Sequence, residues 1–328
     1  MLRVYLLLVA VTSLCSYSVA IVAAQPEGAA YPARPIRLIC PSAPGGTTDL
    51  SARLVAQKLT EAWGKQVVVD NRPGSGGGLG TELAAQAAPD GYTLLLGTIT
   101  SHAINPALNK HLNFDPMKDF APISLVVSSP QLLAVNPSLP VRSVKELVAL
   151  AKAKPGQINY GSAGSGNSSH LVVELFKNAA GINLLHVPYK GSGPAISGVL
   201  SNEVQMIITG VVALSPALRS GRLRGIAVTS AKRSPAYPNL PTFMESGIPN
   251  FDVSSWFGVF APAHTPKAII SKLNGEIVRM LKDPDIQKRL ADSGADPASN
   301  TPEQFAAFVS SELARWDNVV KQAKIPTH

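Results

Sequence analysis

Two loops of this 328-residue chain combine glycine with hydroxyl side chains in a pattern that suits the binding of an anion. They span 41–49 and 161–170, and each follows a short apolar run and precedes a helical pattern. At such a strand-to-helix junction, glycine lets the backbone approach a ligand, while the helix dipole and the unpaired amides of the first turn attract negative charge. We expect these residues at a binding site: Ala43, Pro44, Gly45, Gly46, Thr47 and Asp49 from the first loop, and Ser162, Ala163, Gly164, Ser165, Gly166, Ser168 and His170 from the second.

The spacing of the two loops favours a pair that faces across a cleft. Ligands of open α/β sheets bind at the carboxyl ends of the strands, where both loops would lie. One glycine-rich turn is weak evidence, but here two of them lie about 120 residues apart, one in each proposed half of the chain. A third glycine-rich loop, 71–80, has no intact dinucleotide-binding or P-loop motif, so nucleotide binding is disfavoured.

Two residues of these loops have more than one interpretation. Asp49 either caps its own helix as a first-turn acid, orients the loop, or accepts a hydrogen bond from a ligand hydroxyl or amine. His170 is either a hydrogen-bond donor in the first turn of its helix or a packing residue. The residue types alone leave these alternatives open.

Enzymatic interpretations find little support. The chain has no GxSxG elbow and no HExxH, and its six histidines lack metal-ligand spacing, so we expect neither a metal nor a cofactor. A secreted serine hydrolase would have to use Ser162 or Ser168. A triad of Ser168 or Ser169 with His170 and Asp49 is disfavoured, because neighbours at a helix start rarely point at each other.

The charge pattern indicates a small anionic partner rather than a nucleic acid. The net charge is +8, yet the basic residues are scattered and form no stripe with interleaved aromatics. We interpret this excess as a diffuse field that mildly favours anions. Nucleic acid is therefore not an expected partner.

The elements that must hold the two loops alternate between strand and helix. This order predicts parallel sheets with helices on both faces, and the pattern restarts near residue 131, which favours two lobes. The expected strands are 36–40, 66–70, 92–97, 131–136, 158–161, 184–188, 204–209 and 225–230. The expected helices are 49–63, 82–88, 143–154, 169–180, 194–200, 216–220, 266–281, 284–293 and 302–321.

The first residues predict export. A short basic start, Met1-Leu2-Arg3, precedes an apolar run and small residues up to Ala24, which fits a signal peptide over 1–24. The uncharged run 4–24 is also about long enough to span a bilayer, so a retained anchor is the alternative. Removal of the leader would leave Cys40 as the single cysteine, and export without an internal disulfide suits a bacterial periplasm.

A series of short motifs runs in order along the mature chain. They are Tyr31-Pro32, Arg34-Pro35, Pro44-Gly45-Gly46-Thr47-Thr48-Asp49, Ala52-Arg53, Asn71-Arg72-Pro73-Gly74, Asp90-Gly91-Tyr92-Thr93-Leu94-Leu95, Tyr160-Gly161-Ser162-Ala163-Gly164-Ser165-Gly166, Val187-Pro188-Tyr189-Lys190-Gly191, Gly221-Arg222-Leu223-Arg224, Tyr237-Pro238, Leu240-Pro241-Thr242, Trp256-Phe257-Gly258 and Ala261-Pro262. In this set the chain resembles the Bug-type receptors, the extracytoplasmic solute-binding components of tripartite tricarboxylate transporters.

This resemblance implies a type II periplasmic-binding-protein fold, an α/β fold of two lobes joined by crossover strands that form a hinge. With this fold, we expect lobe I to comprise 31–125 and 229–328, and lobe II to comprise 126–228. We expect a monomeric periplasmic protein. The implied partner is the membrane part of a tripartite transporter, although presentation of the ligand to a sensory receptor is an open alternative.

The resemblance also implies a small carboxylate ligand, held by backbone and hydroxyl groups of both loops and partly through water. A further cleft loop, 98–101, and Asn105 would contribute to the same site. The family commonly carries an acid near the position of Thr209, and its absence here favours a less polar or less amine-bearing acid as the ligand. The site residues added on this basis are Thr100, Ser101, Asn105, Tyr189 and Thr209.

Overall fold

The computed structural model describes residues 31–109 and 111–322. The predicted signal peptide, 1–24, lies outside these residues. Within them, no helix combines the length and the apolar character that crossing a membrane requires.

Strands and helices alternate along the chain, as the sequence pattern predicts. The strands are β1 (Ile36–Cys40), β2 (Val67–Asn71), β3 (Thr93–Thr98), β4 (Phe120–Val135), β5 (Asn159–Ser162), β6 (Leu185–Pro188), β7 (Met206–Gly210), β8 (Arg224–Val228), β9 (Ser254–Pro262) and β10 (Asp296–Pro297). The α-helices are α1 (Thr47–Trp63), α2 (Gly78–Ala85), α3 (Asn105–Leu108), α4 (Val144–Ala153), α5 (Ser168–Ala180), α6 (Ser192–Leu200), α7 (Val211–Arg219), α8 (Lys267–Leu281), α9 (Pro284–Ser293) and α10 (Pro302–Gln322). A 3-10 turn (Ser75–Gly77) precedes α2, and a π-helical turn (Thr100–Ile104) precedes α3.

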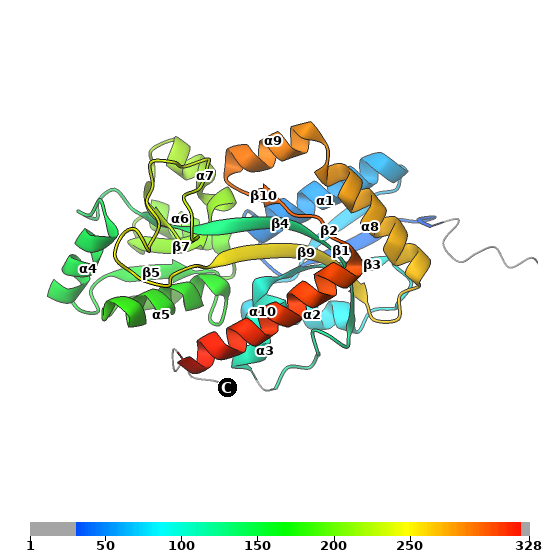
Figure 1. The fold of residues 1–328 in the computed structure, drawn as a ribbon, viewed down its shortest axis with the longest axis horizontal. Coiled ribbons are helices and arrows are strands. Elements are labelled where there is room, and N and C mark those ends of the chain that lie inside the picture. The colour runs from blue at the N-terminus through cyan, green and yellow to red at the C-terminus, as the bar shows by residue number, and fades with distance from the viewer. Residues whose placement is uncertain (1–30, 110, 323–328) are drawn as a thin grey trace, which may run out of the picture.

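The strands follow one path, β2-β1-β3-β9-β4-β7-β5-β6, with β8 and β10 also paired to β4. Each half has a parallel core, because β1 pairs in parallel with β2 and β3, and β5 does so with β6 and β7. In the described chain, the antiparallel pairs all involve β4 or β9. Figure 1 shows helices on both sides of each half. The prediction of a two-lobed α/β fold with parallel sheets flanked by helices is confirmed.

Two long strands join the lobes. β4 pairs with β9 from Phe120 to Pro130 and then with β7 from Gln131 to Val135, so it belongs to both sheets. In Figure 1, β4 and β9 run side by side through the middle of the molecule. The sequence analysis expected a strand only over 131–136 of β4, where Pro122 and Pro130 interrupt the preceding pattern, and expected no strand over β9.

The position of the second crossing bears on the expected lobe boundaries. Between β8 and β9, Phe243 stacks on Phe251 with ring centroids 4.5 Å apart and packs edge-on against Phe176 of α5 at 5.1 Å. This segment therefore lies on lobe II elements. The division at 125 and 228 stays a proposal, and these contacts favour crossings near 130 and 253.

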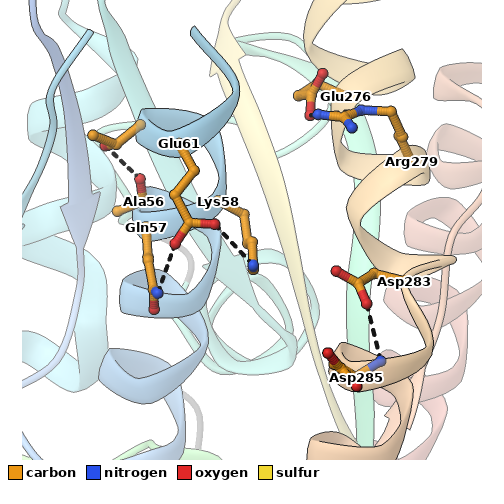
Figure 2. A network of polar contacts seen from close by, with 9 residues as sticks. Ala56, Gln57, Lys58, Glu61, Glu276, Arg279, Asp283 and Asp285 are labelled. Carbon is orange, nitrogen blue, oxygen red and sulfur yellow. Dashed lines mark hydrogen bonds and ion pairs between the residues drawn. The ribbon is translucent and has the colours of Figure 1, made fainter. Parts of the chain in front are cut away.

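The helix α1 that follows the first loop is fixed on its apolar side. Ala52, Val55 and Leu59 are fully buried in one core cluster with strand residues of lobe I, and the helix ends at Gly64, whose φ of 62° is left-handed. Figure 2 shows the exposed side of α1, where Glu61 accepts hydrogen bonds from neighbouring Gln57 and Lys58. It also shows the start of α9, where Asp283 accepts a bond from the amide of Asp285 at 2.9 Å. The exposed pairs of Glu61 add little stability, so burial holds α1 in place, whereas the bond of Asp283 caps the start of α9.

The packing of α10 on the crossing strand gives a test of the fold. A methyl group on Gly258 of β9 would overlap the ring of Phe305 and lie 3.0 Å from the carbonyl oxygen of Ser124. Gly258→Ala should therefore destabilise the protein by about 1–3 kcal/mol in urea unfolding. Gly275→Ala is the matched control, because it lies within α8 with no described atom within 4 Å of the added methyl, and should stabilise by about 0.5–1 kcal/mol. Equal stability of the two variants would contradict this packing.

Candidate ligand-binding site

A cavity of about 30 Å³ lies where the two lobes meet. Its lining comes from the carboxyl ends of β1, β3, β5 and β7, from the start of α6 and from β9. The lining residues are Ser42, Thr47, Thr48, Thr98, Ile99, Thr100, Ala163, Asn167, Ser168, Ser192, Thr209, Gly210, Ser255 and Phe257. This volume is far below the ~300 Å³ or more of pockets that hold drug-sized ligands, and the two lobes touch directly at the cavity, where the Ser168 amide donates to the Thr100 hydroxyl at 3.1 Å.

The chemistry of the lining is that of neutral hydroxyl groups. Among the residues that the structure describes, those facing the cavity are mostly serine and threonine, and none carries a charge. Hydroxyls both donate and accept hydrogen bonds, so they can solvate an anion from every side. The starts of α1, α5 and α6 add the positive ends of three helix dipoles. The site can therefore hold a small anion without a buried cation.

The first loop presents the amides of a helix start to this cavity. Intrahelical bonding in α1 begins with the bond from the amide of Leu50 to the carbonyl of Gly46 at 3.0 Å. The amides of Thr47 and Thr48 precede that bond and have no partner within their own helix. Both of these residues line the cavity.

Asp49 shapes the loop instead of lining the cavity. Its carboxylate is buried and accepts bonds from the Gly45 amide at 3.0 Å, from Arg53 at 2.9 Å and from Asn71 at 2.9 Å. Burial alone would raise the pKa of Asp49, but the hydrogen bonds from Arg53, Gly45 and Asn71 outweigh it and hold the pKa below its ordinary value. Of the three interpretations, the structure favours loop orientation.

The second loop uses most of its amides internally. The amide of Ala163 donates to Ser169 at 2.8 Å, that of Gly164 to the Ser162 hydroxyl at 3.1 Å, and that of Gly166 to His170 Nδ1 at 3.2 Å. The amide of Ser168 donates across the lobes to the Thr100 hydroxyl at 3.1 Å. This loop therefore faces the cavity with side chains of Asn167 and Ser168 more than with main-chain donors, which differs from the expectation.

The predicted site residues divide into two groups. Thr47, Thr100, Ala163, Ser168 and Thr209 line the cavity. The others are not among its lining residues: Ala43, Pro44, Gly45, Gly46, Asp49, Ser101, Asn105, Ser162, Gly164, Ser165, Gly166, His170 and Tyr189.

Several of this second group have other contacts. Ser101 bonds with Thr98 and His102, Asn105 donates to the Gly76 carbonyl at 3.4 Å, and Tyr189 packs against the glycines 161 and 198 of lobe II. Their expected contact with a ligand stays a prediction.

Some lining residues were not predicted. Ser192 lies in the turn 190–193, which has the same glycine-and-hydroxyl pattern before a helix as the two chosen loops, so this signal was present in the sequence. Ser255 and Phe257 lie on β9, which was not predicted as a strand. No sequence signal marked them as cavity residues.

The disfavoured serine triad does not form among the described residues, because Asp49 bonds to Gly45, Arg53 and Asn71 and His170 Nδ1 to Gly166. A histidine pair lies behind the second loop instead. Ser162 Oγ lies 2.6 Å from His186 Nε2, and His186 stacks on His170 with centroids 4.0 Å apart. Because Ser162 is fully buried and already accepts the Gly164 amide, its hydroxyl donates to a neutral His186. His170 Nδ1 likewise accepts from Gly166, which requires a neutral ring at that nitrogen.

This pair makes the second loop sensitive to acid. Burial, together with the neighbouring His170, lowers the pKa of His186 to about 4, and burial also lowers the pKa of His170. Glu174 opposes these shifts, and Lys177 reinforces them. Protonation of both rings would place two positive charges on rings whose centroids lie 4.0 Å apart. A proton on Nδ1 of His170 would also face the N–H of Gly166, which now donates to that nitrogen.

We therefore predict that the free energy of unfolding falls as the pH drops from about 6.5 towards 4. In this window the histidines bind protons in the unfolded chain but stay neutral in the folded protein, where their pKa values are lower. Buried His102, whose pKa burial lowers to about 3, contributes in the same direction. Urea unfolding at pH 7.0, 6.0 and 5.0 should show the loss, and His186→Gln should make it shallower. His111→Gln, at an exposed position, should leave the slope as it is; an unchanged slope in His186→Gln would contradict the assignment.

Comparisons with known proteins agree with this geometry. The family model of the tripartite tricarboxylate transporter family receptor, TctC, matches residues 51–325. BugT of Bordetella pertussis is 39% identical over 302 residues, which cover 92% of this chain and 93% of BugT.

Solved structures extend the likeness to the whole fold. Rpa4515 of R. palustris, solved with adipate, is 38% identical with a TM-score of 0.88, over 91% of this chain and 100% of that one. The periplasmic binding protein BugD is 36% identical with the same score, 0.88, over 91% and 100%. MatC from Rhodopseudomonas palustris, with bound malate, is 33% identical with a TM-score of 0.85, over 88% and 100%. The resemblance to Bug-type receptors is thereby confirmed, and the chain belongs to the tripartite tricarboxylate transporter receptor family, TctC.

Proposed function

We propose that this protein captures a small carboxylate-bearing solute in the cavity between its lobes and delivers it for uptake. The observation that supports this most is the lining itself, a closed set of hydroxyls and helix starts with no charged side chain among the described residues. The relatives solved with adipate and malate bind anions of this class. The membrane part of a tripartite transporter is the proposed partner, and the periplasm is the proposed compartment.

The same lining favours acids that carry no amine. A buried ammonium group needs a carboxylate or several good acceptors, because leaving a charge unpaired in a dry site is costly. The resemblance implies that the family often has an acid near the position of Thr209, whose hydroxyl here donates to Ser192 at 3.0 Å. A hydroxyl or hydrogen at the α-carbon of the ligand fits this surface better than an ammonium.

Delivery to a transporter has one competing proposal, presentation of the ligand to a sensory receptor. Both use the same closed cavity, so the site does not separate them. Growth of a deletion strain on the identified ligand does: loss of growth supports uptake, and unimpaired growth with altered gene expression supports sensing. A serine hydrolase is not proposed. Ser162 bonds to His186 but is fully buried and does not line the cavity, and the hydroxyl of cavity-lining Ser168 donates to Asn167 instead of to a histidine.

We predict a selective thermal shift with carboxylates. Adipate and malate should raise the melting temperature, because a ligand at a hundred times its Kd stabilises the folded state by ~2.7 kcal/mol. Aspartate, which carries an ammonium group where malate carries a hydroxyl, should give little shift. A folded protein with no shift across a broad panel of mono- and dicarboxylates would refute the proposed function.

We also predict that Thr209→Asp reverses this preference. The new carboxylate would repel the carboxylates of adipate and malate, and two like charges at 4 Å cost about 4 kcal/mol at an effective dielectric constant of 20. Their affinity should fall at least ~10-fold in calorimetric titration, while aspartate should gain affinity through its ammonium group. Thr209→Val is the control for the lost hydroxyl alone, and a gain of aspartate binding in that variant would contradict the charge argument.

A further inference from the structure

The first loop meets lobe II at a turn outside the two predicted loops. The turn Lys190-Gly191-Ser192-Gly193 leads into α6, and its Lys190 carbonyl accepts a bond from the Ala43 amide at 3.3 Å. Nearby, the Thr47 hydroxyl donates to the Gly210 carbonyl at 3.4 Å. We call these contacts between 43–47 and lobe II the interlobe seam.

Three lobe II glycines leave no room for a side chain at the seam. A Cβ on Gly193 would lie 2.5 Å from the carbonyl oxygen of Pro44 and 3.2 Å from the carbonyl carbon of Gly45. A Cβ on Gly191 would lie 2.9 Å from that of Ala43. On Gly210 it would lie 2.5 Å from the Thr47 hydroxyl. Contacts below 3.0 Å cannot form without a shift of the neighbouring chain.

The local backbone does not account for all three glycines. Gly191 has a φ of 149°, in the region that favours glycine. Gly210, with a φ of −56°, has a conformation that any residue adopts, and Gly193 lies in the first turn of α6. Alanine is the better helix former at such a position. What excludes a side chain at 193 is therefore the backbone of lobe I.

We propose that Gly193, supported by Gly191 and Gly210, is a positioning residue for ligand capture, because it lets the two lobes meet backbone to backbone. Ser192 lies between Gly191 and Gly193, and Thr209 directly precedes Gly210. The hydroxyls of Ser192 and Thr209 are hydrogen-bonded to each other and line the cavity. A methyl group at 193 would hold Ser192 away from the first loop. The inference rests on the proposed function. If the site is complete only in the closed state, the apparent affinity for the ligand falls in proportion to the fraction of protein that is closed.

A disulfide can report closure without any ligand. The Cβ positions of Gly46 and Ser192 lie 3.2 Å apart, close to the 3.5–4.5 Å that a disulfide spans, and Gly46 has an ordinary extended φ of −88°. Gly46→Cys with Ser192→Cys should therefore crosslink the lobes when they close. Cys40 does not compete, because it is fully buried and burial raises the pKa of its thiol to about 12. The second cysteine of the sequence, Cys15, lies in the predicted signal peptide, and Cys15→Ser in all variants removes it from preparations that keep the leader.

The experiment compares the rate of disulfide formation, followed by gel shift, with and without Gly193→Ala in the double-cysteine protein. We expect Gly193→Ala to slow crosslinking at least ~10-fold with an unchanged urea midpoint, and Gly275→Ala to leave the rate as it is. Gly210→Ala should also slow it, and adding Thr47→Ala should restore the rate, because the clash there is with a side chain. Equal rates with and without Gly193→Ala, or no crosslink in either protein, would overturn the inference.

Binding is measured separately, in single variants without the cysteine pair. Adipate and malate, titrated by calorimetry, should bind Gly193→Ala at least ~10-fold more weakly than the unmodified protein. If the unmodified protein bound neither and no other carboxylate, the proposed function would fail while the crosslinking result still decided the role of the seam. If Gly193→Ala bound them with unchanged affinity, the seam would have no role in capture and the proposed function would stand.

Discussion

The pairing of β4 with two different sheets is the constraint on which the rest of the structure depends. Where β4 leaves β9 and joins β7, Thr229 ties both crossings together: its amide donates to Gln131 and its hydroxyl to Val253, at 2.9 and 2.5 Å. The amide of Val253 in turn donates to the Thr229 carbonyl at 2.9 Å. Because the two sheets share this strand, the carboxyl ends of β1 and β3 are held opposite those of β5 and β7. The cavity lies between these opposed strand ends.

That geometry explains how an anion site can form without a buried cation. Each strand end leads into a helix start, so partial positive charges converge from both lobes on one small volume. The carboxylate of Asp49 in the first loop is held by Arg53 and Asn71 and does not line the cavity, so its negative charge does not oppose an anion there. The helix dipoles of the two lobes act on the same anion only when the lobes are in contact, so ligand binding and lobe closure are coupled.

The sequence predicted most elements within each lobe better than the crossing strands. The predicted strand 36–40 and helix 284–293 match β1 and α9 residue for residue, whereas α7, expected only over 216–220, spans Val211–Arg219. Pro122 and Pro130 break the strand pattern of β4, and β9 is buried along nearly its whole length, so it lacks the alternation that marks a strand. The cavity residues on β9, Ser255 and Phe257, could therefore not be anticipated from local pattern.

The glycines of the first loop show why pattern alone does not decide what a glycine faces. Sequence reasoning took Gly46 as a place where the backbone approaches a ligand, but a Cβ there would point at Ser192 of lobe II. Close approach of the backbone to a ligand and close approach to another segment of the chain both require a residue without a side chain. The two cases differ only in what stands opposite, and that is fixed by tertiary structure. A glycine-rich loop in a two-lobed receptor therefore predicts a close approach, while the crossing strands decide whether solute or protein makes it.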